Sequence, residues 1–153
     1  MPKKVLVPRS LRFQPRPSYP YSPGAAMAGF IFTAGQVAWD SKGRLVGRGD
    51  VRAQTRQTLR NVLAVLAEGG ATADDVLKCT VYLADIRDFA VMNQEFAAVF
   101  AKDPPARTTV QARLAEPEML VEIEAVAYVE PQPPGRRAPS PRRKAARSGQ
   151  GKR

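Results

Sequence analysis

The chain has 153 residues, 44% of them hydrophobic, which suits a single domain with its own core. It contains no histidine and one cysteine, so histidine-dependent nucleophilic catalysis, a structural zinc site and an internal disulfide are excluded. No apolar run has the length of a membrane span, and the first residues lack the pattern of a signal peptide. We therefore expect a cytoplasmic protein with no membrane segment and no metal.

The net charge of +10 is distributed unevenly along the chain. Residues 1–16 contain five basic residues and residues 131–153 contain eight, and neither segment contains an acid. Residues 17–130 contain the other 11 basic residues and all 14 acids, which gives this part a net charge of −3. The basic character therefore belongs to the ends of the chain, and the central part has no excess of positive charge for a nucleic-acid surface.

Composition divides the chain into three parts. Residues 1–18 form a basic segment rich in proline and arginine, in which the apolar pieces 5–7 and 11–13 could add a short edge strand. Residues 19–130 form one α+β domain. Residues 131–153 contain five prolines and no large apolar side chain, so we expect a disordered tail. Two interpretations of the basic ends stay open: solvated segments with no specific role, or a weak, salt-sensitive contact with a polyanion.

The alternation of apolar and polar residues predicts a mixed set of helices and strands in the central domain. In chain order the sequence first predicts a strand at 30–34 and a strand–turn–strand unit at 36–46. A helix is then predicted from Asp50 to about Glu68, where Gly69 and Gly70 end it, and a strand follows at 76–83. A second helix begins at Asp85 or Asp88 and includes Phe100, and strands at 107–114 and 120–128 complete the domain.

Apolar side chains recur at helical spacing in both predicted helices, which indicates that each helix packs on a core. The expected core positions are Val51, Leu59, Val62, Leu63 and Leu66 in the first helix, and Phe89, Met92, Phe96, Val99 and Phe100 in the second. Cys79 lies within the predicted strand 76–83, so we expect a buried and unreactive thiol.

This order of elements predicts a single sheet with two helices packed on one face. In the last strand, the apolar set Val121, Ile123, Ala125 and Ala127 is expected beneath the helices. The alternate positions, which include Glu122, Glu124, Val126 and Tyr128, face the other way. No helix is left to cover that mixed face, so we expect a subunit interface there; a solvent-exposed sheet face is the alternative.

Arg107 is the strongest candidate for a functional residue. It follows Pro104 and Pro105 at the start of a predicted strand, and a guanidinium held there can bind a carboxylate through two parallel hydrogen bonds. Glu122 and Glu124, about 7 Å apart on one strand face, could orient a water molecule or pair with an arginine. Two interpretations of Arg107 stay open: a carboxylate-binding residue, or one half of an ion pair with either glutamate. Arg113 is a competing anion-binding residue, placed deeper in the predicted strand.

Six segments, taken together, resemble the Rid family, the YjgF-like reactive-intermediate enamine/imine deaminases. They run in order from about residue 19 to 129, and no single one is decisive: Pro20–Gly24, Phe32–Gln36, Ala53–Asn61, Phe89–Asn93, Pro105–Val110 and Val121–Ala127.

The resemblance implies a chorismate-mutase-like α+β fold, and a homotrimer in which the sheets face inward and a cleft lies at each subunit boundary. It also implies that Arg107 binds the substrate carboxylate and that Glu122 is associated with the hydrolytic water. The remaining implied substrate-binding positions are Tyr21, Ala34, Gly35, Gln36, Asn93 and Thr109.

The implied reaction is the hydrolysis of small 2-imino or enamine carboxylic acids to 2-ketoacids and ammonia, the work of a hydrolase acting on C–N bonds. An imine is already electrophilic, so no cofactor or metal is expected. The chain departs from the better-known family pattern at three positions. Ala34 replaces a common serine, Thr109 a common cysteine, and Pro23 a common glutamine; Ala34 bears most directly on the choice of substrate.

Two other functions stay open. One is a binding or chaperone-like module that holds a small carboxylate without turnover. The other is an endoribonuclease or translation inhibitor that uses the basic ends of the chain. Release of ammonia from a freshly generated imine distinguishes catalysis from binding, and deletion of residues 131–153 distinguishes deamination from a polyanion-dependent function.

Overall fold

The structure is a computed structural model that describes residues 2–12 and 19–131. The expectations for Phe13 and for the tail after Pro131 therefore lie outside the described residues. The strands are β1 (Lys4–Leu6), β2 (Gly24–Met27), β3 (Phe30–Thr33), β4 (Val76–Leu83), β5 (Ala106–Gln111) and β6 (Val121–Tyr128), and the α-helices are α1 (Val51–Glu68) and α2 (Phe89–Val99). Short 3₁₀ turns lie at Arg9–Leu11, Ala73–Asp75 and Ile86–Asp88.

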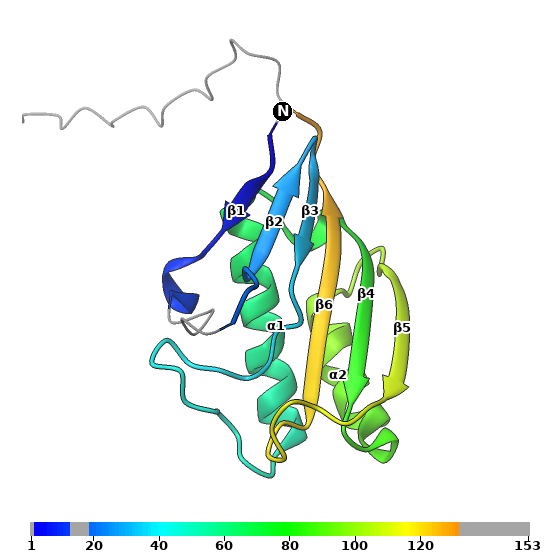
Figure 1. Ribbon diagram of the computed structural model, residues 1–153. Coiled ribbons are helices and arrows are strands. Elements are labelled where there is room, and N and C mark those ends of the chain that lie inside the picture. The colour runs from blue at the N-terminus through cyan, green and yellow to red at the C-terminus, as the bar shows by residue number, and fades with distance from the viewer. Residues whose placement is uncertain (1, 13–18, 132–153) are drawn as a thin grey trace, which may run out of the picture.

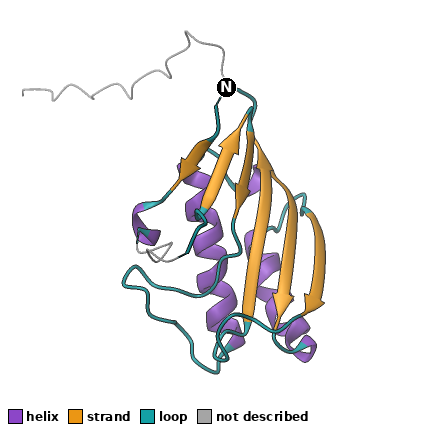
Figure 2. Cartoon of the chain, in the orientation of Figure 1, coloured by secondary structure: helices purple, strands orange, loops and turns teal. Residues whose placement is uncertain are grey.

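The described strands form one six-stranded sheet in the order β1-β2-β3-β6-β4-β5. Neighbouring strands are antiparallel, except that β4 and β5 are parallel and are connected through α2. Figure 1 and Figure 2 show both helices on the same side of the sheet. The predicted fold class, two helices on one face of a single sheet, is confirmed. We call the side covered by α1 and α2 the helix face, and the other side the open face.

The core lies between the helices and the helix face. The four apolar β6 residues predicted there, from Val121 to Ala127, are at most 2% exposed. The expected burial of Cys79 is confirmed, and this desolvation raises its thiol pKa to about 12, which disfavours the reactive thiolate. The prediction of Phe89 as a core residue is wrong. Its side chain is 41% exposed, because the first turn of α2 extends past the edge of the core. No helix of the described residues has the length and hydrophobicity to cross a membrane.

Helix α1 begins and ends as the sequence predicts. The Asp50 carboxylate accepts a hydrogen bond of 3.0 Å from the Ala53 backbone nitrogen, and Gly69 follows the last residue. At the second helix, Asp85 instead caps the 3₁₀ turn before α2 by accepting from the Arg87 nitrogen, and Asp88 occupies the N-cap of α2 without a side-chain cap bond.

The predicted strand–turn–strand unit at 36–46 is confirmed only in part. A turn joins Trp39 to Leu45, which form an isolated antiparallel bridge with hydrogen bonds from Asp40 to Arg44 and from Val46 to Ala38, each 2.9 Å. Neither side of the turn lengthens into a strand. The carbonyls of Val37 and Trp39 instead accept hydrogen bonds of 2.8 and 2.9 Å from the Asn61 side chain of α1.

The strand boundaries differ from the prediction in two other places. The fifth strand ends at Gln111, so Arg113 lies in the loop that follows and not deeper in the strand. Strand β2 was not predicted, because Gly24–Met27 consists mostly of glycine and alanine and has neither strand propensity nor apolar alternation.

The turn between β2 and β3 supports a stability prediction. Ala28 has φ of 52° and Gly29 has φ of 88°, the pair of positive φ values found in type I′ hairpin turns. Alanine is strained in this region, whereas asparagine tolerates it. Ala28→Asn should therefore raise the free energy of unfolding by about 1 kcal/mol in urea titration. Gly29→Ala is the opposite control, because its Cβ would lie 2.6 Å from the Val129 carbonyl oxygen. A stability loss in Ala28→Asn would contradict this prediction.

Candidate functional site

Arg107 lies on the helix face, near the start of the edge strand β5. It is level with the buried Cys79 in the parallel β4–β5 register, and paired residues of neighbouring strands point to the same face. Its guanidinium lies over the ring of Phe96 on α2, with 4.6 Å from Cζ to the ring centroid, and 5.5 Å from the centroid of Phe89. Its Nη2 donates a hydrogen bond of 2.8 Å to Asn93 Oδ1. Three residues of one helix therefore fix the direction of the guanidinium.

A hollow of about 380 Å³ opens beside this guanidinium. The residues that line it, polar at one end and apolar elsewhere, are Arg107, Asn93, Phe96, Ala97, Phe100, Pro104 and Pro105. Among the described residues, no acid forms an ion pair with Arg107, so the alternative pairing with Glu122 or Glu124 is not formed within one chain. A cation beside a partly apolar hollow is suited to a carboxylate that carries a small apolar group.

Glu122 lies on the open face of the sheet. It alternates with the buried Val121 and Ile123, and its antiparallel partner is Tyr82 on β4. The side chain leans over Gly35: a Cβ built there would overlap its Oε1 and lie 2.7 Å from its Cδ. This burial raises the pKa of Glu122, and the neighbouring negative charge of Glu124 raises it further. Glu122 is therefore a carboxylate with an environment that strengthens it as a base.

Tyr82 and Glu124 accompany Glu122 on the open face. The Tyr82 hydroxyl donates a long hydrogen bond, 3.3 Å, to Glu124 Oε1. Desolvation raises the pKa of Tyr82, and the charge of Glu124 raises it further, so the phenol keeps its proton at neutral pH. In the part of the chain that the structure describes, no ion pair includes Glu122 or Glu124.

The segment 34–36 forms the floor beside Glu122. Gln36 exchanges both backbone hydrogen bonds with Ile123, at 2.8 and 3.0 Å, and its side chain is fully buried. Its Nε2 donates to the carbonyls of Pro23 and Ala34. We therefore expect Gln36 to hold the segment in place, while the half-buried Ala34 and Gly35 lie at its surface.

Thr109 and Tyr21, the other two predicted positions, differ in their surroundings. Thr109 alternates onto the same face as Arg107, and its Oγ1 is buried with no hydrogen-bond partner among the described residues. Tyr21 is 45% exposed, and its ring lies 6.2 Å from that of Tyr19, centroid to centroid.

The predicted site residues therefore form two separate groups in one chain. The arginine side consists of Arg107, Asn93, Phe89, Phe96 and Thr109, and the glutamate side of Glu122, Glu124, Tyr82, Ala34 and Gly35. They lie on opposite faces of the sheet, with β4 between their strands. Sequence reasoning missed Phe96 and Phe89 as neighbours of Arg107, although their helical spacing with Asn93 placed them on one side of α2.

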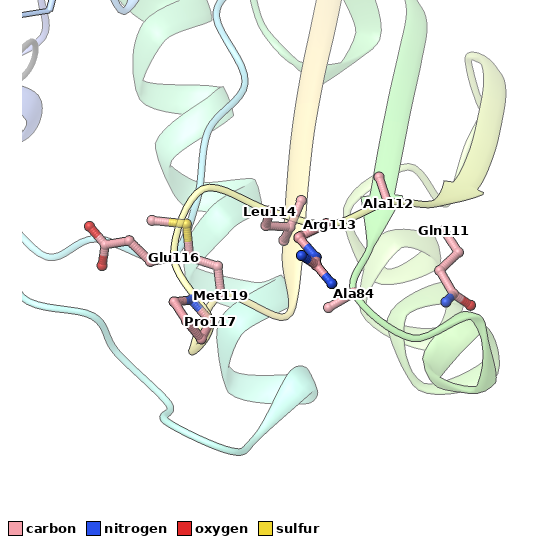
Figure 3. Close-up of a pocket in the computed structure, with 8 residues that line it drawn as sticks. All are labelled: Ala84, Gln111, Ala112, Arg113, Leu114, Glu116, Pro117 and Met119. Carbon is pink, nitrogen blue, oxygen red and sulfur yellow. The ribbon is translucent and has the colours of Figure 1, made fainter.

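The largest of the cavities described, about 470 Å³, lies elsewhere. Its lining projects from the end of β4 and from the β5–β6 loop and includes Arg113, Gln111, Glu116 and Met119 (Figure 3). Arg113 is exposed there, and no residue of the arginine side or the glutamate side lines this cavity. Volume alone therefore does not identify the site, and the geometry favours Arg107 over Arg113 for anion binding.

Comparisons with known proteins identify the family of the chain. Residues 12–129 match the family described as endoribonuclease L-PSP. A RutC family protein of Pyrococcus horikoshii is 43% identical over 116 residues, which cover 76% of this chain and 92% of the relative. The solved structure of a Rid family protein of unknown function from Yersinia pestis has 34% identity and a TM-score of 0.74, and covers 84% of this chain and 100% of its own.

The YjgF gene product of E. coli gives a similar result. Its structure has 32% identity and a TM-score of 0.73, with coverage of 82% of this chain and 98% of its own. The family match includes strands β2 to β6, both α-helices and every residue of the two groups described above. The chain therefore belongs to the endoribonuclease L-PSP family, the family of the YjgF and Rid proteins.

Proposed function

We propose that this protein hydrolyses small 2-imino or enamine carboxylic acids to 2-ketoacids and ammonia. The observation that carries the proposal is the Arg107 guanidinium, aimed by Asn93 and Phe96 beside an open hollow and paired with no described acid. A fixed guanidinium recognises the planar carboxylate that such substrates carry.

The geometry implies that two copies of the chain build each site. Arg107 and Glu122 point to opposite faces of one sheet, so one substrate can meet both only where the arginine side of one copy meets the glutamate side of another. The open face supports such an assembly, since it exposes Met27, Phe30, Phe32 and Tyr128, each at least 39% accessible. A homotrimer with inward-facing sheets is the arrangement that we propose.

The reaction then follows from the two sides. Arg107 binds the carboxylate and places the C=N carbon near Glu122 of the neighbouring copy. A water molecule that donates a hydrogen bond to the Glu122 carboxylate attacks this carbon, and Glu122 takes up its proton. Glu122 gives this proton to the imine nitrogen, which completes the tetrahedral carbinolamine. The hydroxyl proton of the carbinolamine then passes to the same nitrogen, the C–N bond breaks as the C=O bond forms, and ammonia leaves. One imino acid and one water give one ketoacid and one ammonia, so no redox partner is consumed.

Two residues bear on the choice of substrate. Ala34 offers no hydroxyl beside Glu122, so the glutamate side recognises substrate chiefly through backbone groups and the carboxylate itself. The unpartnered Thr109 hydroxyl on the arginine side can donate to, or accept from, a polar substrate atom. The missing hydroxyl at Ala34 favours small, simple 2-imino acids, whereas the Thr109 hydroxyl can accommodate one polar atom of the substrate.

Complementation between two inactive variants tests the shared site. Arg107→Ala and Glu122→Gln are each expected to be inactive, but one intact site forms wherever a chain with Arg107 meets a chain with Glu122. If the assembly is a trimer, mixed trimers purified from co-expressed, differently tagged chains should have about one third of the wild-type activity. The measurement is ammonia release from a 2-imino acid generated in the assay by an amino-acid oxidase.

The control for complementation is the double variant Arg107→Ala/Glu122→Gln co-expressed with either single variant. Such mixtures contain either Arg107 or Glu122 but never both, so they form no intact site. Inactive mixed trimers would contradict a site shared between copies. Turnover by pure Arg107→Ala and pure Glu122→Gln proteins at the wild-type rate would contradict the deaminase proposal itself.

The described residues give less support to the endoribonuclease activity that the family's description names. The chain has no histidine for acid–base work on a phosphodiester, and the open face presents Glu122 and Glu124, which repel phosphate groups. A binding module without turnover has the same arginine side, and the ammonia assay separates it from an enzyme.

A further inference from the structure

The strongest unassigned feature of the glutamate side is its second carboxylate. Glu122 and Glu124 are on the same face of β6, two residues apart, with Cα atoms about 7 Å from one another. The Glu122 carboxylate leans over Gly35, whereas the Glu124 carboxylate is bonded to Tyr82 on β4, so the two carboxylates flank the backbone of β6 on one face of the sheet. Burial raises the pKa of Glu122, and the negative charge of Glu124 on the same strand face raises it further.

We propose that Glu124 is a positioning residue that sets the pH range over which Glu122 is ionised, and that Tyr82 holds Glu124 in place for this role. The inference deepens the proposed function, on which its catalytic consequence rests. A carboxyl group that is harder to ionise gives a more basic carboxylate, which is a stronger acceptor of the proton of the attacking water.

The other groups around Glu122 leave Glu124 as the charge that acts on it. On β4 the partner is Tyr82, which is neutral at working pH, and the next residues on that face are Thr80 and Lys78. Lys78 Nζ donates to Thr108 Oγ1 at 2.6 Å and forms no ion pair with a described acid. On the other side the segment 34–36 contains no titratable residue. Within the chain described, Glu124 is therefore the charged group that acts on Glu122, in agreement with the direction of its pKa shift.

Tyr82 explains why the charge of Glu124 stays on the sheet. A glutamate on an open sheet face can turn its carboxylate toward water, which would screen it from Glu122. The hydrogen bond from the Tyr82 hydroxyl keeps Glu124 Oε1 above β4, the strand on which Tyr82 itself pairs with Glu122. Tyr82 thus holds the Glu124 carboxylate and is the strand partner of Glu122, and it carries no charge itself.

The test is a pair of pH titrations on the full-length assembled protein. The first follows the side-chain carboxyl of Glu122 by ¹³C NMR, with the resonance assigned by its loss in Glu122→Gln. The second measures kcat/KM for a 2-imino acid against pH. Glu124→Gln keeps the shape and the acceptor for Tyr82 but removes the charge, and should lower the midpoint of Glu122 by about one pH unit. The acid limb of the kcat/KM profile should move to lower pH by the same amount.

Two further variants complete the test. Tyr82→Phe keeps the charge of Glu124 but frees it to turn toward water, so the Glu122 midpoint should fall by less than in Glu124→Gln. Glu68→Gln removes one negative charge at the exposed end of α1, in the other layer, and should leave both curves unchanged.

The outcomes separate this inference from the proposed function. An unmoved Glu122 midpoint in Glu124→Gln overturns the inference, as does an equal shift in Glu68→Gln. A lowered midpoint with an unmoved rate profile supports the coupling between the carboxylates and overturns the assignment of water activation to Glu122. A lowered midpoint with a matching shift of the acid limb supports both.

Discussion

Arg107→Lys is expected to lower kcat/KM for a small 2-imino acid by tenfold to several hundredfold, and Arg107→Ala by at least as much. A charged hydrogen bond contributes about 1.5–3 kcal/mol, which corresponds to this range of rates. Lysine keeps the positive charge but presents it as a point, and it cannot form the two parallel hydrogen bonds by which a guanidinium aligns a carboxylate. Charge alone should therefore not rescue the reaction.

The loss should fall on substrate binding and orientation, and a second measurement checks this. The 2-ketoacid product carries the same carboxylate, so its Kd, measured by calorimetry, should weaken in parallel with kcat/KM. Arg113→Lys is the matched control, because Arg113 is exposed, lies after the end of β5 and lines a different cavity. Asn93→Ala should give an intermediate loss, since it removes the acceptor that directs Nη2 but leaves Phe96 beneath the guanidinium.

Wild-type kcat/KM in Arg107→Lys would contradict the bidentate role of Arg107. An equal loss in Arg113→Lys would show instead that general positive charge near β5 matters. Either conclusion requires that all four arginine and asparagine variants melt at the wild-type temperature. This result is expected because Arg107 is half buried at the sheet edge and Arg113 and Asn93 are exposed.

The sequence allowed the candidate residues to be named but not placed relative to one another. Alternation along the last strand correctly assigned Val121 to the helix face and Glu122 to the open face. The face of Arg107 required the register of β5 against β4, which depends on a parallel crossover and is not encoded in any local pattern. Of the two interpretations of Arg107, an ion pair with Glu122 or Glu124 is consequently not formed within one chain.

The same limit explains the errors in the fold. Strand β2 has small residues whose place in the sheet comes from its neighbours β1 and β3, so local propensity gave no signal. Residues 36–46 have strand-like composition, but they pair through isolated bridges, and Asn61 on α1 binds the carbonyls of Val37 and Trp39. In both cases a contact between distant segments decided a structure that local sequence left open.

Gly35→Ala is expected to lower kcat by about tenfold to 100-fold with little loss of stability, although Gly35 performs no chemistry. The added methyl would overlap the Glu122 carboxylate and lie 3.0 Å from its Cγ, so the side chain has to rotate away from the position beside segment 34–36. Gly35 has no positive φ that would make alanine strained, so the effect should come from this overlap alone. Displacement of the carboxylate removes the orientation of the water, not the binding of the substrate, so KM should change much less than kcat.

A double-variant cycle identifies the overlap as the cause. Glu122→Asp shortens the side chain by one methylene and should itself reduce kcat, but it leaves space for the methyl at position 35. Adding Gly35→Ala to Glu122→Asp should then cost only a small further factor, far less than the same change costs in the wild-type protein. Full additivity of the two losses would contradict a steric clash with Glu122 and would place the effect of Gly35 in the backbone of segment 34–36. If Gly35→Ala has almost no effect in the Glu122→Asp background, Gly35 serves the reaction through the position of the Glu122 carboxylate.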